Sequence, residues 1–467
     1  MTLLGLSGIV SPMSPERTDS AGGMPPQSRW QLFGRWLQPG LGVKRWLGLL
    51  VLGIALLGLS FALLLEGLIS LRDTASLLAA LGLGGFPPGL AVAALGAVGL
   101  AASLLSIFRL NRSLLSPFMR HGKPVVEEVA RHRRLSRGPK IVAIGGGTGL
   151  STLLRGLKLH SGNLTAIVTM ADDGGSSGRL RRSLGLPPPG DLRSCLAALS
   201  EDEHLLTQLF QYRFVDGEEL DGHSFGNLFI AAISGVTGSF DRGIQEAGRV
   251  LGIQGQVLPS TLSNVLLVAD KTPELDAQAV RVEGESRIPK FRGQVRRLYL
   301  EPSDPPAYPE AVHALLNADL IVIGPGSLYT SIIPNLLVPD IANAVRASRA
   351  FRIYVCNVAT QAGETDGYDC AAHSRALEEH AGPGLVDLVV ANDCLHTEIP
   401  GGAKSVRPPE NGSIGLPVYL ADLVDDERPW RHDSIQLAES LIALLEERTG
   451  PLDLPKVEKV ESASSLN

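Results

Sequence analysis

The spacing of hydrophobic residues changes at about residue 140. Before that point, the apolar residues gather in two long uncharged runs, Trp46–Leu65 and Leu77–Phe108. From Lys140 onward, short apolar segments alternate with segments whose leucines recur at helical spacing. The pattern predicts two transmembrane helices followed by an α/β domain with a mainly parallel sheet.

The predicted domain starts with a strand, Lys140–Ile144, which leads into five residues rich in glycine, Gly145, Gly146, Gly147, Thr148 and Gly149. A helix is expected over Leu150–Leu159, and a second strand, Leu164–Met170, leads to Asp172 and Asp173. A strand, a glycine turn and a helix together direct backbone N–H groups at an anion, usually a phosphate. The alternative is an ordinary tight turn beside solvated carboxylates.

The remaining segments continue the alternation. Further strands are expected at Val257–Pro259, Leu320–Ile323, Ile353–Val358, Val386–Ala391 and Val418–Leu420, and antiparallel additions to the same sheet at Val265–Ala269 and Val295–Leu300. Further helices are expected from a cap at Asp191 through Ala198, and at His204–Phe210, Ser224–Ser234, Phe240–Leu251, Ala311–Asn317 and Ile435–Glu446.

Polar loops follow several of these strands. Besides the first glycine turn they are Asp172–Arg179, Gly324–Ser327 and Thr360–Asp366. In an open α/β sheet, ligands bind at the edge formed by the carboxyl ends of the strands. Four such loops favour a nucleotide or phospho-sugar cleft there, and Arg179 offers a planar countercharge to a phosphate.

The N-terminal third is predicted to anchor the domain to a membrane. Residues 1–29 have no periodicity and are expected to be a disordered tail. Residues 46–108 form the predicted transmembrane hairpin, with its second crossing at about Leu90–Phe108, after a double proline. Residues 109–139 are a basic linker, 140–450 the α/β domain and 451–467 a loose tail.

Charges beside the two apolar runs predict the orientation of the hairpin. Arginine and lysine flank the outer ends of the pair, whereas the connecting loop holds only Glu66, Arg72 and Asp73. The positive-inside bias places both ends, and with them the large domain, in the cytoplasm. We therefore expect a multi-pass protein of the inner (plasma) membrane.

Composition excludes several classes of protein. A net charge of -6 and an aromatic content of 5% give no reason to expect nucleic acid as a partner. The four cysteines contain no CxxC pair, which argues against a zinc site and against a disulfide framework. The GxGxG spacing from Gly145 places Leu150 where the nicotinamide-dinucleotide fingerprint has Gly or Ala, so a dehydrogenase is the least favoured reading.

Long strings of residues carry a family resemblance. They are GGGTGLSTLLRGLK, ADDGGSSGRLR, PPPGDLRSCLAAL, LFQYRF, GHSFGNLFIAA, VLPSTL, GPGSLYTSIIPNLLV and CNVATQAGETDGY, in this order. The chain resembles the YvcK/CofD-like family over roughly residues 140–450, and most closely its YvcK-type branch, often called gluconeogenesis factors. The two-helix anchor resembles the membrane-tethered variety of that branch.

The resemblance implies a Rossmann-like three-layer α/β domain, a function and a set of site residues. YvcK-type proteins are taken to bind UDP-sugars such as UDP-N-acetylglucosamine and to act on cell shape and on carbon and envelope metabolism. The alternative is the CofD activity, a 2-phospho-L-lactate transferase that uses magnesium, so whether this chain is an enzyme is left open. Carried onto this sequence, the resemblance assigns to the cleft Gly145–Gly149, Asp172, Asp173, Ser176, Ser177, Arg179, His223, Ser224, Asn227, Gly326, Ser327 and Arg431.

Three further expectations concern metals and partners. Asp172 and Asp173 are the candidate Mg²⁺ ligands, since carboxylates suit a hard cation, but they could equally bind a ribose or water. No tightly bound cofactor is expected. In relatives the position of Ser434 resembles a kinase target, and the Arg431 string could also be a plain helix start. The sequence leaves open which sugar is bound and whether the protein forms a homo-oligomer.

Overall fold

The computed structural model describes residues 43–69, 87–115, 125–200, 203–215, 220–273, 278–396, 399–410 and 412–452. The chain divides into two compact units, residues 1–128 and 129–467. The predicted tail 1–29, and 451–467 except for its first two residues, lie outside the described residues.

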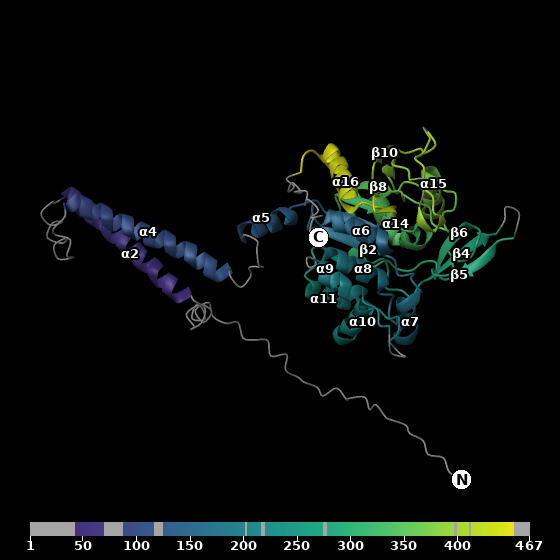
Figure 1. The fold of residues 1–467 in the computed structure, drawn as a ribbon, viewed down its shortest axis with the longest axis horizontal. Helices are drawn as coiled ribbons and strands as arrows, with labels where there is room; N and C mark the ends of the chain where they lie inside the picture. The colour runs from purple at the N-terminus through teal and green to yellow at the C-terminus, as the bar shows by residue number, and fades with distance from the viewer. Residues whose placement is uncertain are drawn as a thin grey trace, which may run out of the picture. The chain divides into compact units, whose positions relative to one another are not determined.

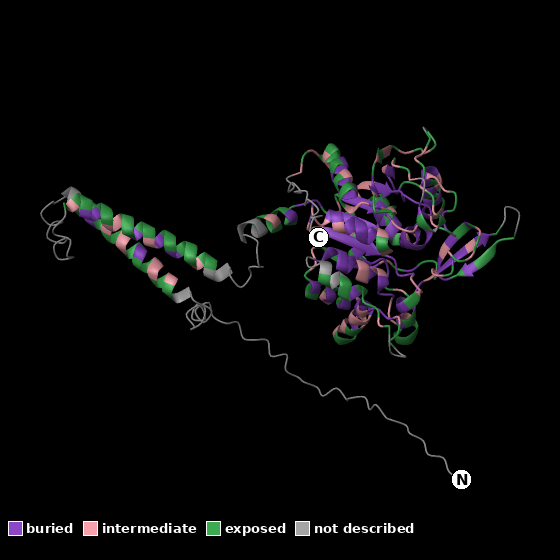
Figure 2. Ribbon diagram, viewed as in Figure 1, coloured by how far each residue is buried: buried purple, intermediate pink, exposed green. Residues whose placement is uncertain are grey.

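The first unit contains a pair of helices, α2 (Val43–Ile69) and α4 (Pro88–Leu115) (Figure 1). Both are long and apolar enough to cross a membrane. The helices pack closely: a β-carbon at Gly99 would lie 2.9 Å from the Gly53 carbonyl oxygen, and the Ser60 hydroxyl donates to the Val92 carbonyl at 2.9 Å. Large apolar side chains such as Phe61 are exposed, and much of both helix ribbons is green, the colour of exposed residues, in Figure 2.

The predicted basic linker is partly helical. Helix α4 continues beyond the expected end at Phe108, and α5 covers Val125–Ser136 with Arg133 and Arg134 in its last turn. Leu135 is buried, and its carbonyl oxygen accepts the Gly162 N–H at 2.8 Å. The end of α5 is therefore fixed to the second unit.

A seven-stranded sheet forms the centre of the second unit (Figure 1). Its strands are β1 (Ile141–Gly145), β2 (Leu164–Val168), β3 (Gln256–Pro259), β7 (Leu320–Ile323), β8 (Phe351–Val355), β9 (Leu388–Asn392) and β10 (Val418–Ala421). The spatial order is β10-β9-β8-β7-β1-β2-β3, and every pair is parallel. The chain winds outward in both directions from β1 and β7, so the topological switch point lies between them.

Every residue of β1, β2 and β7 is buried, so helices cover both faces of the sheet (Figure 2). The helices are α6 (Gly147–Leu157), α7 (Gly175–Leu184), α8 (Gly190–Leu199), α9 (Glu203–Gln211), α10 (Phe225–Thr237), α11 (Phe240–Leu251), α12 (Pro309–Leu316), α13 (Ile333–Leu336), α14 (Pro339–Ala347), α15 (Cys370–Ala381) and α16 (Ser434–Thr449). Helix α16 packs directly on α6, because Gly156 leaves room there for the Ser434 carbonyl.

One prediction about the sheet is wrong. The segments expected as antiparallel additions are antiparallel, but they build a separate sheet of β4 (Leu266–Thr272), β5 (Val280–Glu283) and β6 (Gln294–Glu301). Burial alternates along β6, as it does in strands with only one covered face. Lys271 anchors this sheet: its fully buried ammonium donates to the carbonyls of Ile288 and Gly363.

Three local predictions also need correction. Gly147, Thr148 and Gly149 open helix α6, so the turn itself is little more than Gly146. The expected loop Asp172–Arg179 becomes helical at Gly175, the start of α7. Asp191 lies in the first turn of α8 and does not cap it; Pro189 precedes the helix. A short pair, β11 (Val424–Asp425) and β12 (Arg428–His432), was not expected.

Candidate functional site

The first glycine turn brings the backbone of α6 close to a carboxylate. Gly147 has φ +59°, in the left-handed region that favours glycine. A β-carbon at Gly146 would collide with the Asp191 side chain, which accepts a hydrogen bond from the Gly147 N–H. Two adjacent positions therefore require glycine for different reasons, one for its φ angle and one for space.

A second glycine turn follows β7 and meets the first at the switch point. A β-carbon at Gly149 would lie 2.6 Å from the Pro325 carbonyl oxygen and 2.8 Å from the Gly326 α-carbon. The start of α6 and the turn after β7 are thus in backbone contact, which only glycine at 149 allows. Ser327 ends this turn, and the one-turn π-helix Leu328–Ile332 follows it.

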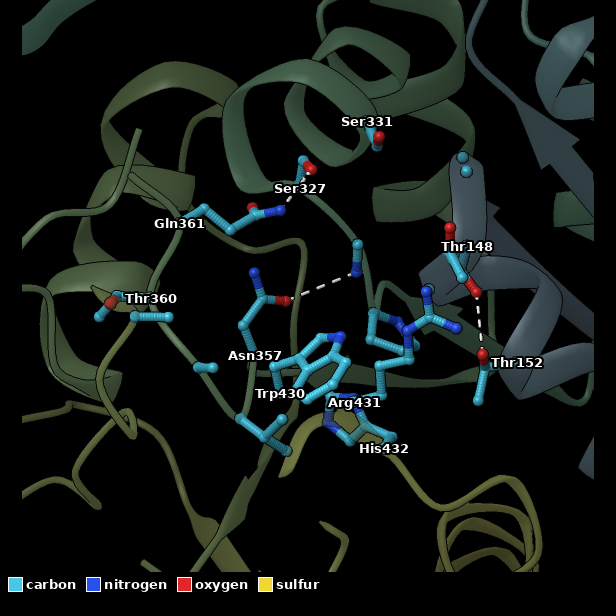
Figure 3. A pocket seen from close by; sticks show the side chains of 18 of the residues that line it. Thr148, Thr152, Ser327, Ser331, Asn357, Thr360, Gln361, Trp430, Arg431 and His432 are labelled. Carbon is cyan, nitrogen blue, oxygen red and sulfur yellow. Dashed lines mark hydrogen bonds between the residues drawn. The ribbon is translucent and has the colours of Figure 1, made fainter. Parts of the chain in front are cut away.

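A pocket of about 380 Å³ opens above these two turns (Figure 3). Its far wall comes from the loop after β8, where the Gln361 side-chain amide donates to the Ser327 hydroxyl at 2.8 Å. The Asn357 oxygen accepts the Gly326 N–H at 3.5 Å. Trp430 and Arg431 of β12 complete the lining.

Arg431 extends from β12 into the pocket (Figure 3). It forms no hydrogen bond or ion pair with any residue that the structure describes. Its neighbour His432 is buried and lies 3.1 Å from the Cys356 carbonyl oxygen through Nε2, which attaches β12 to the end of β8. Burial lowers the pKa of His432 to about 4. His432 is therefore neutral at pH 7 and holds its arginine neighbour in place.

The predicted site residues separate into two groups. The pocket contains Gly146, Gly147, Thr148, Gly149, Gly326, Ser327 and Arg431. Gly145 ends β1 beneath it, and its carbonyl oxygen accepts a hydrogen bond from the buried Asn335 amide at 2.9 Å. The other predicted residues lie on the opposite side of the first glycine turn, around α7 and the start of α10.

On that side, six predicted residues form a buried polar network or adjoin it. The Ser176 hydroxyl lies 3.1 Å from His223 Nδ1 and accepts from the Asn227 amide at 3.1 Å. Ser177 lies within 3.4 Å of the same amide. Burial, and then the charge of Arg179, lower the pKa of His223. The Ser224 hydroxyl caps α10 and accepts from Arg193. The network ties α7 to α10.

A carboxylate cluster borders this network. Asp172 accepts the Gly174 N–H at 2.8 Å, and Asp173 accepts the Ser286 N–H at 2.9 Å. Burial, followed by the charges of neighbouring carboxylates, raises the pKa of Asp191 to about 7 and that of Glu285 to about 8. Burial also raises the pKa of Asp172. The cluster therefore gathers four carboxyl groups beside the glycine turn, and at pH 7 Glu285 mostly keeps its proton.

The cluster does not by itself enclose a metal ion. Within the described part of the chain, no three His, Cys, Asp or Glu side chains are arranged to hold one. Mg²⁺ commonly takes only one or two carboxylates from the protein and completes its shell with water and ligand phosphates. The donor chemistry of Asp172 and Asp173 fits such an open site.

Several residues of the site were not predicted. Asn357 and Trp430 line the pocket, while Asp191 and Glu285 belong to the carboxylate cluster. A single asparagine after a strand forms no sequence pattern that indicates a binding site. The same holds for a tryptophan in a short β-hairpin such as β11–β12. The only available signals were positions in the sequence: Trp430 precedes Arg431, and Asn357 lies near the end of the predicted strand Ile353–Val358.

The fold and the pocket together define a doubly wound α/β domain with a pocket at the switch point of its sheet. A family model described as "2-phospho-L-lactate transferase CofD" matches residues 141–408, more than half of the chain. The chain belongs to the CofD family, and within it to the YvcK-type branch of gluconeogenesis factors.

Individual relatives support this assignment. The chain is 45% identical over 442 residues to a putative gluconeogenesis factor of Nostoc sp., covering 87% of this chain and 91% of that protein. It is 46% identical over 325 residues to the gluconeogenesis factor of Bacillus subtilis, covering 67% of this chain and 100% of that protein. A crystal structure of a UPF0052 family member from Bacillus halodurans is 43% identical, with a TM-score of 0.61, and covers 66% of this chain and 99% of that one.

Proposed function

We propose that the protein binds a UDP-sugar in the switch-point pocket and acts as a membrane-attached regulator. The observation that carries the proposal is the convergence of two glycine turns with an arginine that has no partner among the described residues. Exposed backbone at the start of a helix and a planar guanidinium are the two groups that recognise a diphosphate.

Each part of the ligand has a matching wall in this proposal. The diphosphate lies over Gly147 and Thr148 and pairs with Arg431. Trp430, 39% exposed, offers an aromatic face to the uracil ring. The polar side chains of Asn357 and Gln361 meet sugar hydroxyls. Because the pocket holds about 380 Å³, part of the ligand extends beyond it.

Calorimetric titration of the full-length protein in detergent tests the proposal. UDP-N-acetylglucosamine, GDP, NAD and a deazaflavin are titrated separately. Saturable binding of the UDP-sugar, with much weaker binding of the other three, supports the proposal that the protein is a UDP-sugar-binding regulator. Preferential binding of GDP and the deazaflavin would instead support a CofD-type transferase. Preferential binding of NAD would favour a dinucleotide-dependent enzyme.

The membrane attachment is part of the same proposal. The outward apolar side chains of α2 and α4, and the arginines beside them, suit a hairpin with both ends in the cytoplasm of the inner membrane. Cysteine labels at residue 20 and within 70–80 of sealed vesicles should react from opposite sides. An externally reactive label at residue 20 would overturn this topology.

A second candidate function is the CofD-type transfer of 2-phospho-L-lactate, and the carboxylate cluster favours it. Asp172 and Asp173 would hold Mg²⁺, which would neutralise ligand phosphates when bound. Adding Mg²⁺ should raise the thermal unfolding midpoint of the wild type but not of Asp172→Asn. An equal rise in the unfolding midpoint of both proteins would show that Mg²⁺ does not bind at Asp172.

Regulation through Ser434 completes the proposal. Ser434 opens α16 three residues after Arg431. A phosphate there gains from the helix N-terminus and competes with the ligand for the Arg431 guanidinium. Through such control the protein would act on cell shape and on carbon and envelope metabolism. Deleting the gene and complementing with Arg431→Ala tests this role: normal cell shape in the complemented strain would contradict it.

A further inference from the structure

A second and larger hollow adjoins the pocket. Its volume is about 1150 Å³, and it lies between α6, α8, α9, β12 and the start of α16. We call it the arginine chamber, because five arginines line it: Arg155, Arg193, Arg213, Arg428 and Arg431. It shares Thr148, Thr152, Arg431 and His432 with the switch-point pocket, so the two hollows are neighbours.

Three acids, Asp425, Glu427 and Asp433, line the chamber beside the five arginines, so positive side chains outnumber negative ones. The Asp433 carboxylate accepts the N–H groups of Ile435 and Gln436 at 2.8 Å each and so caps α16. Asp425 pairs with Arg428 at 3.4 Å. Among the described residues, Arg193, Arg213 and Arg431 form no ion pair with a carboxylate.

Two of these arginines oppose each other. The partly buried Arg193 donates only to hydroxyls, those of Ser224 at 2.8 Å and Ser194 at 3.4 Å. Burial, and then the positive charge of Arg213, lower the pKa of Arg193. Like charges in a partly desolvated wall cost free energy. The carboxylates of Asp191 and Asp172 offset part of this cost, and an anion bound between the two arginines would offset more of it.

We propose that the arginine chamber binds a second small molecule, one that carries a phosphate group, beside the nucleotide-sugar pocket. Guanidinium groups match phosphate oxygens in pairs. The hydroxyls of Ser151 and Ser194 in the same wall already donate to the carbonyls of Thr148 and Gly190, so the arginines are the groups that recognise the phosphate. This second site goes beyond the UDP-sugar proposal, because Arg193 and Arg213 line the arginine chamber and do not line the switch-point pocket.

Arg431 couples the two sites. It lines both hollows, so a phosphate in the chamber and a diphosphate in the pocket share one guanidinium. The chamber ligand therefore changes the affinity for the nucleotide-sugar, and by linkage the reverse holds by the same factor. Ser434 also lines the chamber, so a phosphate attached to it is a second source of the same chemistry.

Calorimetric titration of the full-length protein with pyrophosphate tests the site. The variants are Arg213→Gln alone and combined with Arg193→Gln, with Gly147→Val to disable the pocket. Arg249→Gln is the matched control, since Arg249 is paired with Glu246 on α11. Arg213 is exposed, so its single variant should fold, which the thermal unfolding midpoint verifies.

Arg213→Gln should weaken pyrophosphate binding about tenfold, and the double variant more, because each lost charge-assisted bond costs that much. Gly147→Val and Arg249→Gln should retain it. Loss in Gly147→Val together with wild-type affinity in both arginine variants would place the anion at the glycine turn and overturn the chamber site. Failure of UDP-N-acetylglucosamine to bind any of these proteins would instead refute the proposed function alone.

Two Ser434 variants distinguish the sources of the phosphate. Ser434→Ala should bind pyrophosphate like the wild type, as expected for a free small molecule. Ser434→Asp should bind it more weakly, because an attached carboxylate competes for the same arginines. If pyrophosphate binds no protein that carries Ser434 and binds Ser434→Ala, the chamber serves the attached group and the small-molecule proposal is wrong.

Discussion

The two sides of the first glycine turn differ in charge although the same sheet edge builds both. On one side lie the pocket and the arginine chamber, with Arg431 unpaired by carboxylates in the described chain. Arg193 lines the chamber and also reaches the other side, where it donates to Ser224. On the other side lies the carboxylate cluster of Asp172, Asp173, Asp191 and Glu285. Parallel strands place loops at one edge, but the side chains that arrive there decide what each half can bind.

The two sides are also held differently. On the pocket side, backbone touches backbone at Gly149 and Pro325, and the Gly326 N–H donates to a neutral amide, that of Asn357. On the acid side, backbone N–H groups are already used by carboxylates, as at Asp173 and Ser286. An anion is therefore expected on the first side and a cation on the second. Asp191, bonded to the Gly147 N–H, stands between them.

The largest effect is expected from Gly147→Val. A β-branched residue at φ +59° is strained, and its side chain would cover the N–H groups at the start of α6. UDP-sugar binding should fall by about 100-fold or more, as measured by calorimetry. Gly252→Val is the matched control, with φ +60° and open space at the end of α11. Equal loss in both variants would make the effect one of stability rather than of the pocket.

Arg431→Ala should have the next largest effect. Losing one charge-assisted pair, worth about 1.5–3 kcal/mol, weakens UDP-sugar binding by about one to two orders of magnitude. Arg431→Lys should restore only part, because a lysine has charge without the planar fork. Wild-type affinity in Arg431→Ala would show that the glycine turns alone hold the ligand.

The pH dependence of protein stability tests the protonation state of the carboxylate cluster. The pKa of Glu285 is raised to about 8 in the folded protein, against about 4.3 in an unfolded chain. The folded state therefore holds the extra proton, and stability falls as pH rises between these two values. Glu285→Gln should reduce this fall by up to about 1 kcal/mol per pH unit, measured by urea unfolding at pH 6 and pH 8. Identical slopes for both proteins would mean that Glu285 is ionised throughout.

The smallest effect on UDP-sugar binding is expected when an acidic residue is introduced beside the arginines of the chamber. Ser434→Asp places a carboxylate at the start of α16, near Arg431. Because the new group remains partly solvated, competition for the guanidinium should weaken UDP-sugar binding by less than about tenfold. Ser434→Ala should leave it unchanged. If Ser434→Asp binds the UDP-sugar as tightly as the wild type does, α16 has no influence on the pocket.

The sequence by itself determined the elements whose signals are local. The apolar runs predicted α2 and α4. The periodicity from Phe240 to Leu251 predicted both ends of α11 correctly. The first glycine turn lies, as predicted, where strand β1 ends. A continuous apolar run must be removed from water, either in a protein core or in a membrane. A glycine-rich segment directly after a buried strand favours a tight turn.

Only the tertiary structure decided how the site is divided. Asp172 and Arg431 were expected in one cleft, yet they lie on opposite sides of Gly146, because β7, and not β2, borders the pocket side of β1. Trp430 reached the pocket through a short hairpin bonded to the end of β8. Charge balance in a cleft depends on strand order and on contacts between distant segments, and neither leaves a periodic pattern in a single chain.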